Sequence, residues 1–184
     1  MKLTPPIRVG VVGTGLMGEV HARNVYERSA AARLVAVADA DADRARALAR
    51  ELGGARVDGG VEVIAADDVD AVIIASPDAT HAGYALACIR SGKPVLCEKP
   101  LASTADDAWA VVEAEAATGR RLLQVGFMRE FDPAHVAVRF AVTSGRIGNP
   151  VMFRGTHLNP APGDLDSVER CITQSMIHDF HSAR

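Results

Sequence analysis

A glycine-rich segment between an apolar run and a helical pattern constrains the fold of this sequence most. Residues 7–12 read Ile-Arg-Val-Gly-Val-Val, and residues 13–18 follow as Gly-Thr-Gly-Leu-Met-Gly. A second apolar run, residues 33–38, ends at Asp39, 21 residues after the last of these glycines. A strand, a tight glycine turn, a helix and a second strand form a βαβ unit, which predicts a parallel sheet.

The spacing of the three glycines is typical of a loop that holds a dinucleotide. Gly13 permits the tight turn, Gly15 lets the backbone approach a pyrophosphate, and Gly18 lets the helix over residues 16–28 pack closely on the sheet. The N-terminus of that helix favours an anion. The cofactor-binding residues expected in this segment are Gly13, Thr14, Gly15, Leu16, Met17 and Gly18.

Asp39, at the tip of the second strand, predicts which dinucleotide binds. A carboxylate there accepts hydrogen bonds from the ribose hydroxyls of the adenosine and repels a 2′-phosphate, so NAD is favoured over NADP. Arg44 is the nearby guanidinium, but its place in a helix starting near Asp43 predicts a surface residue. A glycine loop followed by an acid is also compatible with an S-adenosylmethionine site.

Composition narrows the class of partner. With 184 residues, 23% of them charged, and a net charge of −3, the chain has no basic cluster for nucleic acid or an anionic membrane. No apolar run approaches the roughly 20 residues of a membrane span. Cys88, Cys97 and Cys171 fit neither a disulfide framework nor a zinc site. We expect a cytoplasmic protein that binds a small molecule and no metal, with Cys88 and Cys97 in the core.

Apolar runs and helical patterns alternate up to Gly126, which predicts an α/β fold with a doubly wound parallel sheet over residues 1–126. After that point the pattern changes, and residues 127–184 read as the start of an α+β substrate domain. There we expect a helix over 133–144, a strand over 151–157 and a helical stretch from Thr173. Because the apolar side chains of the last stretch have nothing left to cover them, we interpret the chain as truncated.

Three further segments carry a resemblance to a known family. They are Ala75-Ser76-Pro77-Asp78-Ala79-Thr80-His81-Ala82, Ser91 to Ala102 with Glu98-Lys99-Pro100 at its centre, and Gly126-Phe127-Met128-Arg129 through Pro133. Together they resemble the Gfo/Idh/MocA oxidoreductases. His157-Leu158-Asn159-Pro160 and Ile177-His178-Asp179-Phe180 are most similar to the inositol 2-dehydrogenase branch.

The resemblance implies a Rossmann fold and further cofactor-binding residues. The carboxyl ends of adjacent parallel strands meet in one crevice, so the loops after them can reach the same dinucleotide. The residues so implied are Ser76, Pro77, His81, Glu98, Lys99 and Pro100. His81 is equally compatible with a capping or packing role, and His21 with a contact to a neighbouring segment. The family suggests a cis Lys99–Pro100 bond and, in full-length relatives, a homo-oligomer formed through the C-terminal sheet.

Hydride removal from a secondary alcohol requires a base for the hydroxyl proton and a cation near the developing alkoxide. We assign these catalytic roles to His178 and Lys99. The substrate-binding residues expected are Lys99, Arg129, His157, Asn159, Gln174 and His178. Gln174, His178 and His181 have the i, i+4, i+7 spacing of one helix face, but the family commonly has Asp at the first and third of these positions.

Three functions remain open from the sequence. The first is an NAD-dependent dehydrogenase of a cyclic polyol or sugar resembling myo-inositol. The second is a truncated or degenerate relative that binds NAD without turnover. A methyltransferase is the third, and it gives Glu98-Lys99-Pro100 no role.

Overall fold

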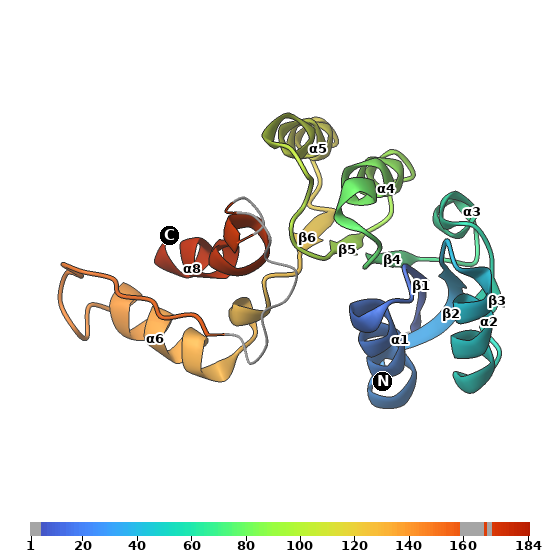
Figure 1. Ribbon diagram of the computed structural model, residues 1–184, viewed down its shortest axis with the longest axis horizontal. Helices are drawn as coiled ribbons and strands as arrows, with labels where there is room; N and C mark the ends of the chain where they lie inside the picture. Colours follow the sequence, from blue (N-terminus) through green and yellow to red (C-terminus); the bar gives the residue numbers. More distant parts are fainter. Residues whose placement is uncertain (1–4, 159–167, 169–170) are drawn as a thin grey trace. The chain divides into compact units, whose positions relative to one another are not determined.

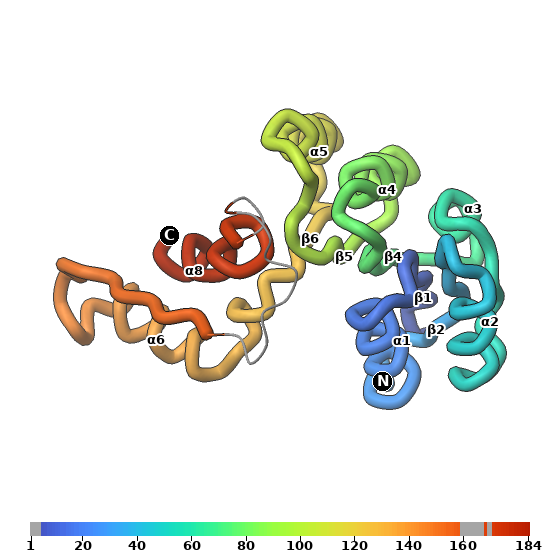
Figure 2. The backbone as a smooth tube through the Cα atoms, in the orientation of Figure 1, coloured from blue at the N-terminus to red at the C-terminus, as the bar shows by residue number. Residues whose placement is uncertain are grey.

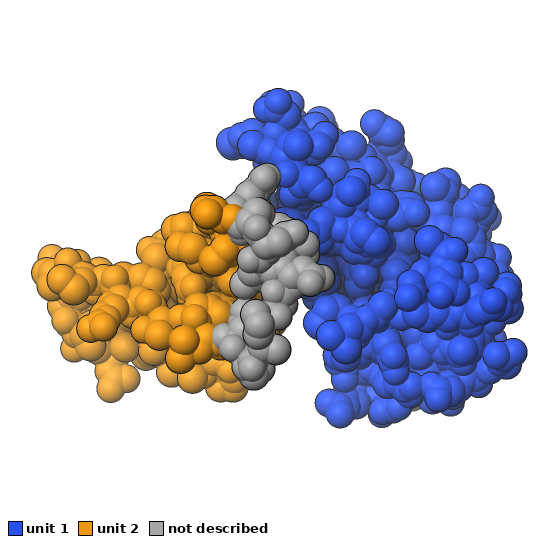
Figure 3. Space-filling model, viewed as in Figure 1, with its two compact units in different colours: residues 1–125 blue, residues 126–184 orange. Residues whose placement is uncertain are grey.

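The computed structural model describes residues 5–158, 168 and 171–184. The chain separates into two compact units, residues 1–125 and residues 126–184, which are coloured separately in Figure 3. The first unit contains the alternating strands and helices, and its path can be followed from blue to yellow in Figure 2. The second unit consists of helices and irregular segments in the residues that the structure describes.

The first unit is built on a six-stranded parallel sheet in the order β3-β2-β1-β4-β5-β6. The strands are β1 (Ile7–Val12), β2 (Ala32–Ala38), β3 (Arg56–Val57), β4 (Ala71–Ile74), β5 (Val95–Cys97) and β6 (Leu123–Val125). The sheet grows in two directions from β1: β2 and β3 lie on one side of it, and β4, β5 and β6 lie on the other. The sequence prediction of a doubly wound Rossmann sheet is therefore confirmed.

Helices cover both faces of this sheet (Figure 1). The helices of the first unit are α1 (Leu16–Arg28), α2 (Ala42–Glu51), α3 (Gly60–Ala65), α4 (Asp78–Arg90) and α5 (Ala105–Ala117). One apolar layer packs α1 and α2 on the sheet through residues such as Ala22 and Leu48. The other packs α3, α4 and α5 through residues such as Ile64, Cys88 and Val111.

The two core cysteines are placed as predicted. Cys88 and Cys97 are fully buried, and burial raises the pKa of each thiol to about 12. All three cysteines are free thiols. None of the helices that the structure describes is long and apolar enough to cross a membrane.

The second unit begins with a 3₁₀ turn (Met128–Glu130) and α6 (Pro133–Thr143). Asp132 caps α6 by accepting a hydrogen bond from the His135 amide, and Pro133 occupies the first turn, where its missing N–H costs nothing. A π-helical turn (Cys171–Met176) leads into α8 (Ile177–Ala183). Ile172, Met176 and Phe180 remain exposed on this stretch, as the sequence predicted.

The strand predicted over residues 151–157 is wrong. Residues 151–158 form neither strand nor helix, and Val151 is 98% exposed. A strand needs a neighbour to pair its backbone groups, and no other part of the described chain in the second unit is extended in a sheet. The apolar residues at the start of this segment were therefore not sufficient to form a strand here.

Candidate functional site

The glycine loop between β1 and α1 has a shape that two of its glycines make possible. Gly13 has φ +93°, and a Cβ placed on it would lie 2.4 Å from the Ser76 amide nitrogen. A Cβ on Gly18 would lie 1.8 Å from the Gly13 carbonyl oxygen. A larger residue at Gly13 would therefore push the loop away from the end of β4, and a larger residue at Gly18 would push α1 away from the turn at Gly13.

Gly15 differs from its two neighbours because its Cα faces open space. A Cβ built there meets no atom within 4 Å, and Gly15 is also the N-cap of α1, with no side chain capping the helix. An uncapped helix N-terminus with open space in front of it suits a pyrophosphate. Leu16 and Met17 lie in the exposed first turn beside it. The loop thus fits the dinucleotide that the sequence predicts.

Asp39 lies at the carboxyl end of β2 and is bound to the same loop. Its Oδ2 atom accepts hydrogen bonds from the amide of Thr14 at 2.6 Å and from the hydroxyl of Thr14 at 2.8 Å. Burial raises the pKa of the Asp39 carboxyl, but the hydrogen bonds from Arg44, Thr14 and Asp41 outweigh it and lower the pKa to about 2. Asp39 is therefore a carboxylate at neutral pH.

The expectation that Arg44 is only a surface residue is incomplete. Its side chain is half exposed, but Nη2 lies 2.7 Å from Oδ1 of Asp39. Asp41 caps α2 by accepting hydrogen bonds from the amides of Asp43 and Arg44, which places Arg44 in the first turn. From there the guanidinium reaches Asp39, the acid that the sequence predicts to select the cofactor.

The loop after β4 contains Ser76 and Pro77, followed by α4. The Ser76 hydroxyl lies 2.6 Å from that of Thr80, and the ring of His81 is almost fully buried beneath the loop. Its Nε2 lies 2.8 Å from the Ser76 carbonyl oxygen, and its Nδ1 lies 2.7 Å from the Pro100 carbonyl oxygen. The packing alternative thus accounts for both ring nitrogens, and any contribution of His81 to a cofactor site is indirect.

The loop after β5 carries Glu98, Lys99 and Pro100, and the Lys99–Pro100 peptide bond is cis, as the resemblance implied. Nε2 of His21, on α1, lies 2.8 Å from Oε1 of Glu98. The Lys99 amide donates to Oε2 of Glu98 at 3.3 Å. The backbone of this loop is thus held between β5 and the helix that starts at the glycine loop.

Backbone hydrogen bonds show that these loops leave the sheet at one edge. The Gly13 amide donates to the Ala38 carbonyl at 2.7 Å, and the Ala75 amide donates to the Val12 carbonyl at 2.8 Å. The Glu98 amide donates to the Ile74 carbonyl at 2.9 Å. The carboxyl ends of β2, β1, β4 and β5 are therefore direct neighbours, and this edge is where open α/β sheets bind ligands.

In the second unit, Arg129 and His157 share one partner, which the sequence analysis did not assign. Arg129 Nη1 lies 2.7 Å from Oδ1 of Asp179, and Nδ1 of His157 lies 3.4 Å from Oδ2 of the same carboxylate. The hydrogen bond from Arg129 holds the pKa of the Asp179 carboxyl below its ordinary value. The ring centroids of His157 and His178 are 6.5 Å apart. The structure therefore brings three of the predicted site residues together around Asp179.

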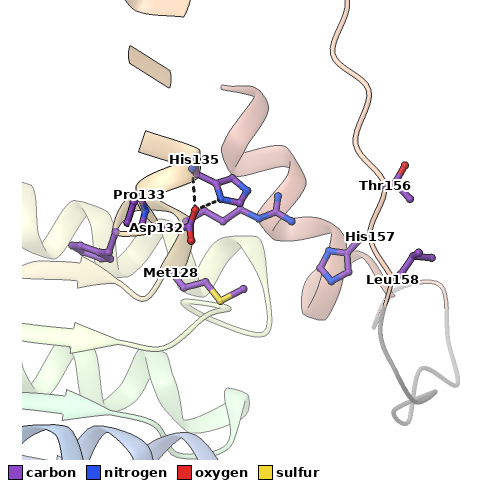
Figure 4. A pocket seen from close by; sticks show the side chains of 9 residues that line it. Met128, Asp132, Pro133, His135, Thr156, His157 and Leu158 are labelled. Atoms are coloured by element: carbon purple, nitrogen blue, oxygen red, sulfur yellow. Dashed lines mark hydrogen bonds and ion pairs between the residues drawn. The ribbon is translucent and has the colours of Figure 1, made fainter. Parts of the chain in front are cut away.

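An open cavity of about 570 Å³ adjoins this cluster. Figure 4 shows Asp132 and His135 on one side of the cavity and Thr156, His157 and Leu158 on the other. Arg129 also lines it. The cavity therefore combines a guanidinium, a carboxylate, two imidazoles and a hydroxyl group with apolar side chains, a mixture that suits a small polar ligand.

Three further residues named from the sequence are Gln174, His181 and Asn159. Gln174 lies in the π-helical turn, whose i to i+5 hydrogen bonds break the α-helical spacing from which a common face with His178 was predicted. The ring of His181 stacks on Phe127 at 4.0 Å, and burial lowers its pKa. Asn159 lies outside the described residues.

The fold and the first unit's loops define an α/β protein built to hold a dinucleotide at its switch point. A family model for the GFO_IDH_MocA proteins, described as an oxidoreductase family with an NAD-binding Rossmann fold, matches residues 7–127. The chain belongs to this family of oxidoreductases.

The chain is also similar to individual proteins. An inositol 2-dehydrogenase of Rubrobacter xylanophilus is 53% identical over 178 residues, which are 97% of this chain and 51% of that protein. A crystal structure of myo-inositol dehydrogenase from Lactobacillus casei in complex with NAD(H) and myo-inositol matches with a TM-score of 0.92 and 33% identity, covering 97% of this chain and 53% of that one. A putative myo-inositol dehydrogenase from Sinorhizobium meliloti matches with a TM-score of 0.87 and 40% identity, covering 97% and 54%. This chain thus spans about half the length of the relatives it matches.

Proposed function

We propose that this chain carries the cofactor-binding part of an NAD-dependent oxidoreductase acting on a secondary alcohol of a cyclic polyol or sugar resembling myo-inositol. The observation that carries the proposal is the set of loops at the carboxyl ends of β1, β2, β4 and β5, which leave the sheet side by side. Gly13 to Gly18 would hold the pyrophosphate and Asp39 the adenosine ribose. When bound, NAD supplies the acceptor for the hydride of the alcohol.

Lys99 is proposed to bind the substrate oxygen. It follows the end of β5, and its backbone is held by the hydrogen bond from its amide to Oε2 of Glu98. An ammonium at this position stabilises the negative charge that develops on an oxygen losing its proton. Ser76, Pro77, Glu98 and Pro100 are proposed to line the cofactor site around it.

His178 is proposed to accept the hydroxyl proton, because an imidazole is the side chain best suited to this transfer near neutral pH. The ring is almost fully buried, which shields the reacting group from bulk water. Arg129, His157, Asn159 and Gln174 are proposed to bind the hydroxyl groups of the substrate. Homo-oligomerisation through a C-terminal sheet and a cytoplasmic location remain predictions of the sequence.

The test is a panel of inositols and sugars assayed with NAD and with NADP by absorbance at 340 nm. Lys99→Ala should lower kcat for the best substrate by at least about 100-fold. Lys93→Ala is the matched control, since Lys93 follows α4 and donates to the Ala66 carbonyl. Full turnover by Lys99→Ala would show that the role assigned to Lys99 is wrong.

The two other functions predict different results. Tight NAD binding without turnover of any substrate, also in a chain extended to the length of its relatives, would favour a relative that only binds the cofactor. Binding of S-adenosylmethionine but not of NAD would favour a methyltransferase. Calorimetry with both cofactors therefore accompanies the assay.

A further inference from the structure

The carboxylate of Asp39 is saturated with hydrogen bonds. Oδ2 accepts from the amide and hydroxyl of Thr14, and Oδ1 accepts from the Asp41 amide at 2.8 Å and from Nη2 of Arg44 at 2.7 Å. A carboxylate offers about four acceptor positions, and four donors occupy them here. A ribose hydroxyl that binds Asp39 must therefore replace one of these donors.

Arg44 is the donor that is easiest to replace. Two of the others are backbone amides, and the Thr14 side chain is almost fully buried. The Arg44 side chain is 51% exposed, whereas that of Asp39 is 5% exposed. Water can solvate the guanidinium once it leaves, and ion pairs with an exposed partner contribute little to stability.

We propose that Arg44 is a specificity-determining residue of the adenosine site, released from Asp39 by the ribose of NAD and bound to the 2′-phosphate when NADP enters. A guanidinium that reaches the Asp39 carboxylate also reaches a phosphate on the hydroxyl beside it. Its planar set of donors matches phosphate oxygens. Arg44 thereby offsets the repulsion that Asp39 exerts on the 2′-phosphate, and NADP is a second, weaker cofactor of this chain.

This inference rests on the dinucleotide site of the proposed function but not on its substrate chemistry. It is tested by calorimetry on the 184-residue chain with two probes, 5′-ADP and adenosine 2′,5′-bisphosphate, which compare adenosine phosphates with and without a 2′-phosphate. Arg44→Ala should lose at least about tenfold in affinity for the 2′,5′-bisphosphate and less than about threefold for 5′-ADP. Arg46→Ala is the control, because Arg46 belongs to the same helix and pairs with Asp43 instead. It should change both affinities by less than about twofold.

A second pair of variants removes the acid. Asp39→Asn should raise the affinity for the 2′,5′-bisphosphate about tenfold, and Asp39→Asn combined with Arg44→Ala should cancel most of that gain. Asp39→Ala also removes the acid, and it leaves more room for the 2′-phosphate than Asp39→Asn does. An unchanged affinity for the 2′,5′-bisphosphate in Arg44→Ala, or a gain that persists in the double variant, would overturn the role of Arg44. Failure of the wild-type chain to bind 5′-ADP at all would overturn the dinucleotide site as well.

Discussion

Nε2 of His21 lies 2.8 Å from Oε1 of Glu98, and both side chains are largely buried. The pair joins α1, which starts at the glycine loop, to the loop after β5 that carries Lys99. Glu98 also accepts the Lys99 amide through its other oxygen. One carboxylate therefore holds together two segments of the predicted cofactor site.

The Glu98 pair should make stability depend on pH. Burial raises the pKa of the Glu98 carboxyl, but the hydrogen bond from His21 and the Lys99 amide outweigh it, so the pKa lies below its ordinary value. A carboxyl whose pKa is lowered by folding stabilises the native state above its unfolded pKa of about 4.3 and loses that contribution as pH falls through the folded value. Glu98→Gln should therefore destabilise the chain at pH 7 by about 1–3 kcal/mol, and less below pH of about 4.

Urea unfolding at pH 7 and at pH 3.5 measures this difference. Glu113→Gln is the control, because Glu113 is exposed on α5. It should have little effect at either pH. An equal loss of stability in Glu98→Gln at both pH values would contradict the electrostatic account and leave only a packing effect.

Gly15 and Gly18 should respond differently to the same substitution. Gly15→Ala adds a methyl group to open space, so the fold should be retained while NAD affinity falls by at least about tenfold, because the methyl group occupies the place of the pyrophosphate. Gly18→Ala forces a Cβ against the Gly13 carbonyl and should destabilise the fold by about 1–3 kcal/mol or more.

Thermal unfolding and NAD titration of both variants provide the test. The two measurements separate a binding defect from a folding defect. Wild-type NAD affinity in Gly15→Ala would mean that the pyrophosphate does not lie on this loop.

The first unit could be predicted from the sequence because its signals are local. The strand over residues 7–12, the helix over residues 16–28 and the apolar run over residues 33–38 are present as β1, α1 and β2, with ends that agree within one residue. Buried parallel strands are apolar on both faces, and the glycine loop marks the turn between the first strand and the first helix. The two-residue strand β3 and the short helix α3 were missed, because segments of that length carry no periodicity.

What the sequence could not predict depends on contacts between distant residues. In the sequence, Asp179 stands out only as part of the segment Ile177-His178-Asp179-Phe180, although its side chain binds Arg129, 50 residues away along the chain. Nothing in the local sequence distinguishes it from exposed acids such as Asp106. The pairing of Arg44 with Asp39, only five residues away, was missed for another reason: it depends on the side chain turning back over the helix start, which spacing alone does not determine.

Glu115 is a second carboxylate whose role the sequence hides. It is 7% exposed on α5, and its Oε1 accepts the amides of Leu122 and Leu123 at 2.7 and 2.8 Å. These bonds hold the segment that enters β6. Glu115→Ala leaves two buried amides without this acceptor and should cost about 2–4 kcal/mol. Chemical denaturation should show this loss against Glu113→Ala as control, and a cost below about 0.5 kcal/mol would contradict it.

His81 should act as a positioning residue for the loops after β4 and β5, which belong to the predicted cofactor site. Its Nδ1 lies 2.7 Å from the Pro100 carbonyl oxygen and its Nε2 lies 2.8 Å from the Ser76 carbonyl oxygen, so the ring bridges the two loops. His81→Phe keeps an aromatic ring but removes the polar bridge between the two carbonyls. The variant should lose about 2–4 kcal/mol of stability and bind NAD more weakly.

His81→Gln and His135→Gln complete the experiment. Glutamine keeps an N–H donor, so His81→Gln should recover part of the NAD affinity that His81→Phe loses. His135 is an exposed histidine of α6 that contacts Asp132, and its substitution should leave NAD affinity unchanged. NAD affinity is measured by titration and stability by urea unfolding. If His81→Phe lost stability but bound NAD as tightly as the wild-type chain, His81 would hold the fold together without positioning the cofactor loops.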